Sequence, residues 1–203
     1  MTEQLPRYTR AVIDAVRGAE VDGALPVPGL DVLGDIYPFS APAAVQRLAE
    51  PVLPEPARSA VTAQACGTCR RPDEAFLWTN DAWRLTHLNA DEPLGVHAFM
   101  LFPREHLDHH ELTPELARQQ GALLVAIERA ILAGIEGVGR VHLNRWGDGS
   151  AHLHWWFIVR PAGVLQLRGS HLPTWLDVLP PLDPDVVAAD GAAVAARVND
   201  YVG

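Results

Sequence analysis

The sequence predicts an α+β fold, an antiparallel sheet backed by one long helix, with an extension at each end of the chain. The chain has 203 residues, of which 48% are hydrophobic and 20% charged, the composition of a soluble folded protein. Its central part contains β-prone runs and one strong helix start in the order strand, strand, strand, helix, strand, strand. That order is typical of an antiparallel sheet covered by a helix.

The first three strands are expected before residue 104. The β-prone runs 75–78 and 82–88 flank Asn80-Asp81, a pair of turn-forming residues, and predict a hairpin. Residues 96–102 (VHAFMLF) form a continuous apolar run that ends at Pro103. Such a run is typical of a strand buried on both faces.

The long helix is expected to begin at Thr113-Pro114-Glu115 and to end near Ala133. Thr is a good N-cap, Pro suits the first helical position, and an acidic side chain stabilises the first turn. Gly134 and Gly137 then stop the helix. The apolar residues that fall on one face are Leu116, Leu123, Leu124, Ile127 and Ile131.

Two further strands, 139–144 and 152–159, complete the expected core, which spans residues 63–161. Residues 162–203 form a C-terminal extension, with Trp175, Leu176 and Leu179 as docking residues and a helix from Pro184 to about Val198.

Residues 1–62 are rich in proline and glycine, which interrupt long regular elements. We expect this segment to be an arm that wraps the core, with helices at 8–19 and 42–48.

Charge and composition narrow the class of function. The net charge is −9, from 16 Lys plus Arg and 25 Asp plus Glu, the opposite of the balance expected for a protein that binds duplex nucleic acid. A small anionic ligand stays compatible, because one basic pocket suffices. Neither a signal peptide nor an apolar stretch of membrane-spanning length is evident, so we expect a cytoplasmic protein.

The segment from Asn144 to Arg160 carries the strongest chemical signal. On a strand, His152 and His154 project to the same side, and Trp156 follows them. The preceding loop contains Gly147, Gly149 and Ser150, whose backbone N–H groups suit phosphate oxygens. A neutral imidazole there can attack phosphorus and form a covalent intermediate. The alternative is that both histidines only satisfy local hydrogen bonds in a half-buried strand.

Cys66-Gly-Thr-Cys69 is a second candidate site. A CxxC pair serves structural zinc or dithiol redox chemistry, and it also occurs as two unreactive thiols. Redox chemistry is disfavoured because no βαβ pattern surrounds the motif. Zinc is favoured because the chain supplies imidazole ligands downstream: His106, His109, His110 and His152. For the isolated histidines we expect structural or surface roles: His87, His97, His142 and His171.

These motifs together resemble the histidine triad superfamily, whose hallmark is His-φ-His-φ-His, where φ is apolar. Here the segment is His152-Leu-His154-Trp-Trp156, so tryptophan stands at the third histidine position. Upstream, Cys66-x-x-Cys69, the strand ending in Phe102-Pro103-Arg104-Glu105-His106 and the helix start all follow the family's order. The likeness covers roughly residues 63–161.

The resemblance implies a role for each matching position. His154 would be the nucleophile that attacks a nucleoside α-phosphate and becomes nucleotidylated. In zinc-bearing relatives similar to galactose-1-phosphate uridylyltransferase, the matching residues bind structural Zn²⁺: Cys66, Cys69, His106 and His152. Asn144 would lie near the ribose and phosphates, and Ser150 lies near the position of a phosphate-contacting hydroxyl. In relatives the third position, here Trp156, contacts the phosphate and the leaving group. Beside the resemblance, the loop with Gly149 suits phosphate oxygens, and the ring of Trp156 could stack on a nucleobase. Members are often homodimers, so a homodimer is expected here too.

Trp156 is the main departure from the family pattern. Its indole has one N–H donor and cannot relay a proton, so general acid catalysis would need another group. Two functions therefore stay open. One is a nucleotide hydrolase or nucleotidyltransferase that uses His154, and the other is a catalytically inactive, zinc-stabilised module that binds nucleotides or a partner.

Overall fold

The expected order of strands and helix is the order found. The computed structural model describes residues 50–176 and 179–202, and the helices expected at 8–19 and 42–48 lie outside this part. The chain divides into two compact units, Met1–Glu55 and Pro56–Gly203. The fold described below belongs to the second unit.

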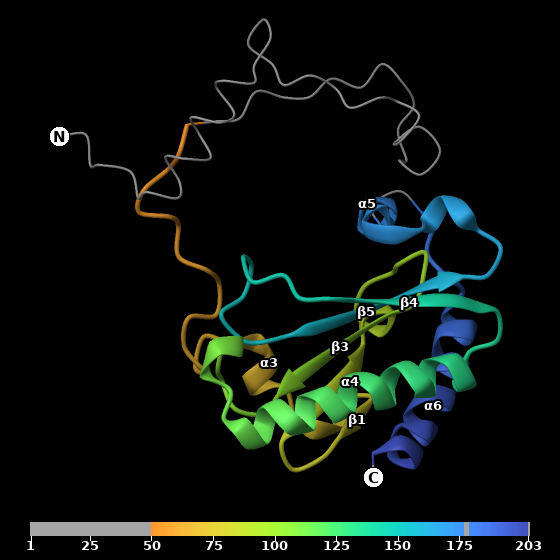
Figure 1. Cartoon of the computed structure of the whole chain (residues 1–203), viewed down its shortest axis with the longest axis horizontal. Coiled ribbons are helices and arrows are strands. Elements are labelled where there is room, and N and C mark those ends of the chain that lie inside the picture. The colour runs from red at the N-terminus through yellow and green to blue at the C-terminus, as the bar shows by residue number, and fades with distance from the viewer. Residues whose placement is uncertain (1–49, 177–178, 203) are drawn as a thin grey trace, which may run out of the picture. The chain divides into compact units, whose positions relative to one another are not determined.

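Five antiparallel strands form one sheet in the order β1-β2-β3-β5-β4. The strands are β1 (Trp78–Thr79), β2 (Trp83–His87), β3 (Ala98–Pro103), β4 (Val138–Asn144) and β5 (Trp155–Pro161). The helices are α3 (Gly67–Arg70), α4 (Pro114–Gly134), α5 (Leu172–Leu176) and α6 (Pro184–Tyr201). Short 3₁₀ helices span Asp73–Ala75, Leu88–Ala90, His109–Glu111, Leu165–Leu167 and Gly169–His171. The α+β prediction, with the long helix α4 between β3 and β4, is confirmed (Figure 1).

The predicted hairpin forms, but its first strand is shorter than expected. The side-chain oxygen of Asn80 accepts hydrogen bonds from the N–H groups of Ala82 and Trp83, at 3.0 and 2.7 Å, and so closes the turn. Strand β1 begins only at Trp78, because the preceding residues form a 3₁₀ turn around Asp73. The Asp73 carboxylate is held there by Arg84 and Arg104, at 3.0 and 2.7 Å.

Helix α4 begins as predicted. Thr113 caps it by accepting a hydrogen bond from the Leu116 N–H at 3.2 Å, with Pro114 at the first helical position. The predicted apolar face is confirmed: Leu123, Ile127 and Ile131 are buried, and Leu116 and Leu124 pack against the same core.

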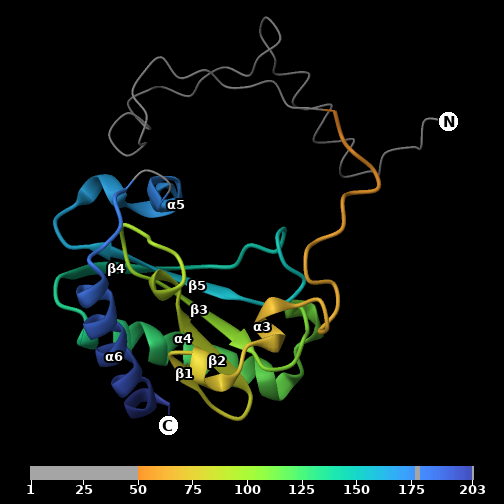
Figure 2. The same cartoon turned by 180° about the vertical axis from the view of Figure 1, so that it is seen from behind.

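Helix α6 lies beside α4 (Figures 1 and 2). The C-terminal extension therefore contributes to the hydrophobic core that α4 forms with the sheet. Val194 and Val198 of α6 are fully buried in the same cluster as α4. A Cβ added at Gly134 would lie 3.1 Å from the Ala193 backbone, so glycine permits this close approach. Among the described residues, none of the helices combines the length and the apolarity needed to cross a membrane.

The opposite face of the sheet carries a smaller core. Along β5, Trp155, Phe157 and Val159 pack with the α4 cluster, whereas Trp156 and Ile158 point to the other side. There they pack with the docking residues predicted in the C-terminal extension: Trp175, Leu176 and Leu179. Helix α5 therefore covers part of the sheet face opposite α4 (Figure 1).

Candidate metal centre and nucleophile

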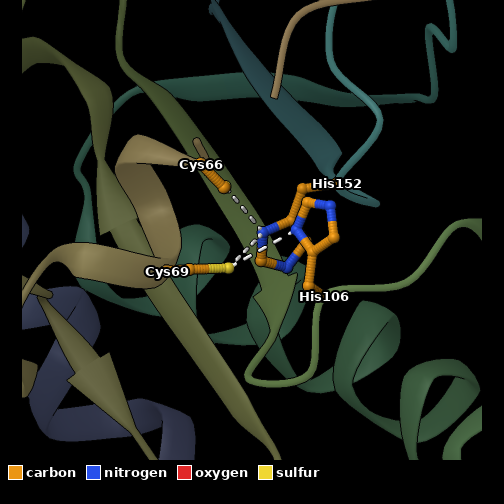
Figure 3. A group of neighbouring side chains, drawn as sticks. All are labelled: Cys66, Cys69, His106 and His152. Carbon is orange, nitrogen blue, oxygen red and sulfur yellow. Dashed lines mark hydrogen bonds between the residues drawn. The ribbon is translucent and has the colours of Figure 1, made fainter. Parts of the chain in front are cut away.

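The structure brings together the four side chains that the sequence suggested as metal ligands (Figure 3). Cys66 immediately precedes α3 and Cys69 lies within it, while His106 follows β3 and His152 precedes β5. One ligand atom from each residue lies within 4.8 Å of all the others. His109 and His110, the alternatives to His106, are exposed and lie outside this cluster.

The spacing within the cluster fits a tetrahedral ion. A Zn–S bond of about 2.3 Å and a Zn–N bond of about 2.0 Å at the tetrahedral angle place sulfur and nitrogen about 3.5 Å apart. His152 Nδ1 lies 3.3 Å from the Cys66 sulfur and 3.4 Å from the Cys69 sulfur. His106 Nδ1 lies 3.4 Å from the Cys69 sulfur. The donor set and its dimensions therefore suit one zinc-sized cation.

A second contact orients the His152 ring. Its Nε2–H donates a hydrogen bond of 2.9 Å to the Pro103 carbonyl, so the lone pair of Nδ1 faces the cluster. Such outer contacts hold metal-binding histidines in one tautomer. His152 is 1% exposed, and burial lowers its pKa, which favours the neutral form that binds metals.

The environment of Cys69 argues against a dithiol redox pair. Burial, the hydrogen bond with Cys66 and the charge of Cys66 raise the pKa of the Cys69 thiol to about 11. Reactive dithiols depend on a lowered thiol pKa, so a dithiol redox role is disfavoured. A cation between the sulfurs would reverse this effect by stabilising both thiolates.

His154 lies two residues beyond the cluster, but not on a strand. The expected strand 152–159 begins only at Trp155, and His152–His154 form an irregular segment. The main chain there is held by the contacts of His152 and by the Leu153 N–H, which donates to the Leu107 carbonyl at 2.8 Å. The prediction that both histidines lie on a strand was therefore wrong.

A backbone contact sets the tautomer of His154. Its Nδ1–H donates to the His152 carbonyl at 2.9 Å, which leaves the lone pair on Nε2. The ring is half-buried and lies close to Phe102, with 6.3 Å between ring centroids. In the neutral ring, Nε2 is therefore the nitrogen with the lone pair that a nucleophile requires.

Two tryptophans lie beside His154. The rings of His154 and Trp156 are 6.4 Å apart, and the exposed Trp146 packs edge-on against Trp156 at 5.5 Å. Asn144, the last residue of β4, pairs across the sheet with Trp156. Within residues 50–176 and 179–202, the buried indole N–H of Trp156 has no hydrogen-bond acceptor.

The glycine loop that precedes the histidines is tied to a segment far away in the sequence. Ser59 donates to the Gly149 carbonyl through both its N–H and its hydroxyl, each at 2.8 Å, and its own carbonyl accepts from the Ala151 N–H at 3.0 Å. Ser150 accepts a hydrogen bond of 3.3 Å from the His152 N–H. Nothing in the local sequence pattern around Ser59 predicts this pairing with residue 149.

A buried carboxylate anchors the same loop. Asp108 caps the 3₁₀ helix His109–Glu111 and binds Arg58 at 2.7 Å and Arg145 at 2.5 Å. Burial acts to raise the pKa of Asp108, but the His109 N–H and the two guanidinium groups outweigh it and lower that pKa to about 2. Arg58 also donates to the Gly147 carbonyl at 3.0 Å. No motif in the sequence predicts this role for Asp108, Arg58 and Arg145.

Solved structures share this architecture. A histidine triad protein from Bradyrhizobium japonicum is 17% identical over 61% of this chain and 89% of its own, with a TM-score of 0.50. A zinc-bound histidine triad family protein from Mycobacterium smegmatis is 18% identical over 68% of this chain and 96% of its own, with a TM-score of 0.45. No protein-family model and no curated protein matches the sequence. The chain has the fold of the histidine triad proteins.

Proposed function

We propose that this protein is a nucleotide hydrolase or nucleotidyltransferase that acts at a nucleoside α-phosphate through a covalent nucleotidyl-His154. The observation that carries the proposal is the 2.9 Å hydrogen bond from His154 Nδ1 to the His152 carbonyl. It supports an unprotonated Nε2 as the attacking atom and holds the ring in place.

The proposed reaction has two steps. In the first, the Nε2 lone pair forms a bond to the α-phosphorus, and the bond from phosphorus to the leaving group breaks with its electron pair on that group. In the second, water or another acceptor hydroxyl attacks the same phosphorus, loses its proton to solvent and releases His154. Splitting one displacement into two is the general advantage of a covalent intermediate.

We assign the binding of phosphate oxygens to the loop around Gly149 and Ser150, together with Asn144. The carbonyls of Gly147 and Gly149 are engaged by Arg58 and Ser59, and the Ala151 N–H is engaged by the Ser59 carbonyl. These contacts hold the loop in place and support a role for the N–H groups of residues 147–150 in binding an anion. Trp156 would stand beside the leaving group, and its buried N–H supports a role as a hydrogen-bond donor there.

We propose that the cluster of Cys66, Cys69, His106 and His152 holds a structural Zn²⁺. The ion would join α3 to the end of β3 and to the segment before β5, and His154 lies two residues from one of its ligands. Its chemical contribution would be to fix this segment, since all four tetrahedral positions are taken by protein atoms. Binding of the ion by this cluster would therefore stabilise the folded state.

The second candidate is a zinc-stabilised module that binds nucleotides without turnover. It is favoured by Trp156, which can donate a hydrogen bond but cannot protonate a leaving group. An enzyme with this site would depend on substrates whose leaving group departs without a proton, or on a proton from solvent.

Intact-mass spectrometry distinguishes the two functions. The wild type and His154→Ala are mixed briefly with dinucleoside polyphosphates, nucleoside phosphoramidates and sugar nucleotides, and His110→Ala, an exposed histidine, is the matched control. The enzyme predicts an acid-labile nucleotidyl adduct on the wild type and on the control, but none on His154→Ala. Nucleotide binding without adduct or product would refute the enzyme and support the module.

A further inference from the structure

Three polar side chains contact one another in a row at the end of β3 opposite the metal-ligand cluster. His87 ends β2, His97 immediately precedes β3, and Asp190 comes from α6. The Asp190 carboxylate lies 2.9 Å from His97 Nε2, and His97 Nδ1 lies 3.1 Å from His87 Nε2. His152 contacts Pro103, the last residue of β3, so the strand separates the two sites by roughly 20 Å.

The order of these contacts determines which nitrogen of His87 carries the proton. Burial lowers the pKa of His97, so its ring is neutral near pH 7. The carboxylate only accepts, so neutral His97 donates from Nε2 and keeps a lone pair on Nδ1. His87 must then donate its Nε2–H to that lone pair, which leaves Nδ1 of His87 unprotonated. Burial, with a smaller contribution from the charge of His97, lowers the pKa of His87 to about 4, so the ring is neutral near pH 7.

His87 lines a cavity of about 610 Å³ that lies outside the site of His154. Most of the wall is apolar, and it includes Phe76, Leu77, Leu94, Leu182, Val187 and Gly191. A Cβ added at Gly191 would lie 2.8 Å from His87 Nδ1, so only glycine lets α6 approach this nitrogen so closely. The ring of His87 is held flat against Phe99, with 4.3 Å between centroids.

The charges at the mouth of the cavity help to define what it accepts. Arg71 and Asp91 both line it, and they form an ion pair of 2.9 Å with each other. Glu74 also lines the cavity, but it is exposed and solvent screens its charge, so these three side chains favour a charged ligand only weakly. Apolar walls and one fixed acceptor instead suit a ligand with an apolar body and one N–H donor.

We propose that this cavity is a second binding site, for an uncharged aromatic heterocycle that donates a ring N–H to His87 Nδ1. Asp190 and His97 act as positioning residues that hold the acceptor in its tautomer. The site does not depend on the function proposed for His154, because it shares no residue with that site.

Indole and benzofuran test the assignment, because they have nearly the same shape and only indole has an N–H. Titrations of the full chain at pH 7.5 are followed by calorimetry and by the side-chain ¹⁵N signals of histidine. We expect saturable 1:1 binding of indole, a shift of the His87 Nδ1 signal, and binding of benzofuran weaker by about tenfold. Equal affinities, no saturable binding of indole, or a protonated Nδ1 in the free protein would refute the proposal.

Two variants locate the binding. Ala188 lines the cavity from the exposed side of α6, and Ala189 beside it is also exposed but is not part of the wall. Ala188→Phe should weaken indole binding at least tenfold, and Ala189→Phe should leave it unchanged. Both sites are on the helix surface, so the fold is retained. Indole binding that survives Ala188→Phe would overturn the assignment to this cavity.

Discussion

The histidine pair beneath α6 predicts that lowering the pH destabilises this protein through His87. The pKa of His87 falls from 6.5 to about 4 on folding, so the unfolded chain binds a proton that the folded chain excludes. Stability is therefore fully present above the unfolded pKa and is lost as the pH falls from 6.5 toward 4. A shift of this size corresponds to about 3 kcal/mol, most of which is lost by pH 4.5.

The assay compares wild type with His87→Gln. Urea unfolding at pH 7.5 and at pH 4.5 gives the pH-dependent loss of unfolding free energy for each protein. Gln keeps a donor but does not titrate in this range, so its loss should be smaller by about 2 kcal/mol. Subtracting the pH-dependent losses of the two proteins cancels contributions that both retain, such as protonation of the metal-ligand cluster.

His110→Gln, a substitution of an exposed histidine, is the matched control and should behave as wild type. An equal pH-dependent loss in wild type and His87→Gln would refute the assignment of a neutral, buried His87.

Three further predictions concern the ligand cluster, the loop and the helix contact. Cys66→Ser should lower the zinc content measured by mass spectrometry and lower the melting temperature, and an unchanged Tm together with metal-free wild type would contradict the zinc proposal. Asp108→Ala leaves two guanidinium groups without their carboxylate and should cost about 2 kcal/mol in unfolding free energy, as measured by urea denaturation. Gly134→Ala places a Cβ 3.1 Å from the α6 backbone and should destabilise the protein by about 1–3 kcal/mol. Gly121→Ala, in the same helix with nothing within 4 Å, should instead stabilise it by up to about 1 kcal/mol, and the same sign for both would refute the close packing of α4 on α6.

The fold class could be predicted from the sequence because its signals are local. A cap at Thr113, a proline at the next position and a one-sided apolar pattern specify α4 through contacts within a few residues. The turn at Asn80 is likewise made by a side chain that binds N–H groups two and three residues later. Both partners in such interactions lie within a few residues of each other, so the interactions can be predicted without the tertiary structure.

The tertiary structure decided how distant segments meet. The alternation of His152 and His154 has the period of a strand, yet contacts with Leu107 and Pro103, more than 40 positions away, hold that segment in an irregular form. In the sequence His87 and His97 look like isolated histidines, but in the structure they contact each other, and α6 brings Asp190 to His97 from 93 positions away.

The loop before the histidines is also held by a distant residue, because Ser59 binds the Gly149 carbonyl through its backbone N–H and its hydroxyl. Local propensity was enough to predict the class of fold. Motif spacing suggested a metal site at Cys66 and Cys69, and the resemblance to the histidine triad superfamily selected His106 and His152 as the other ligands. Pairings between segments far apart in sequence depend on the packing of the whole core. The local sequence around each partner therefore does not predict which distant residue it will contact.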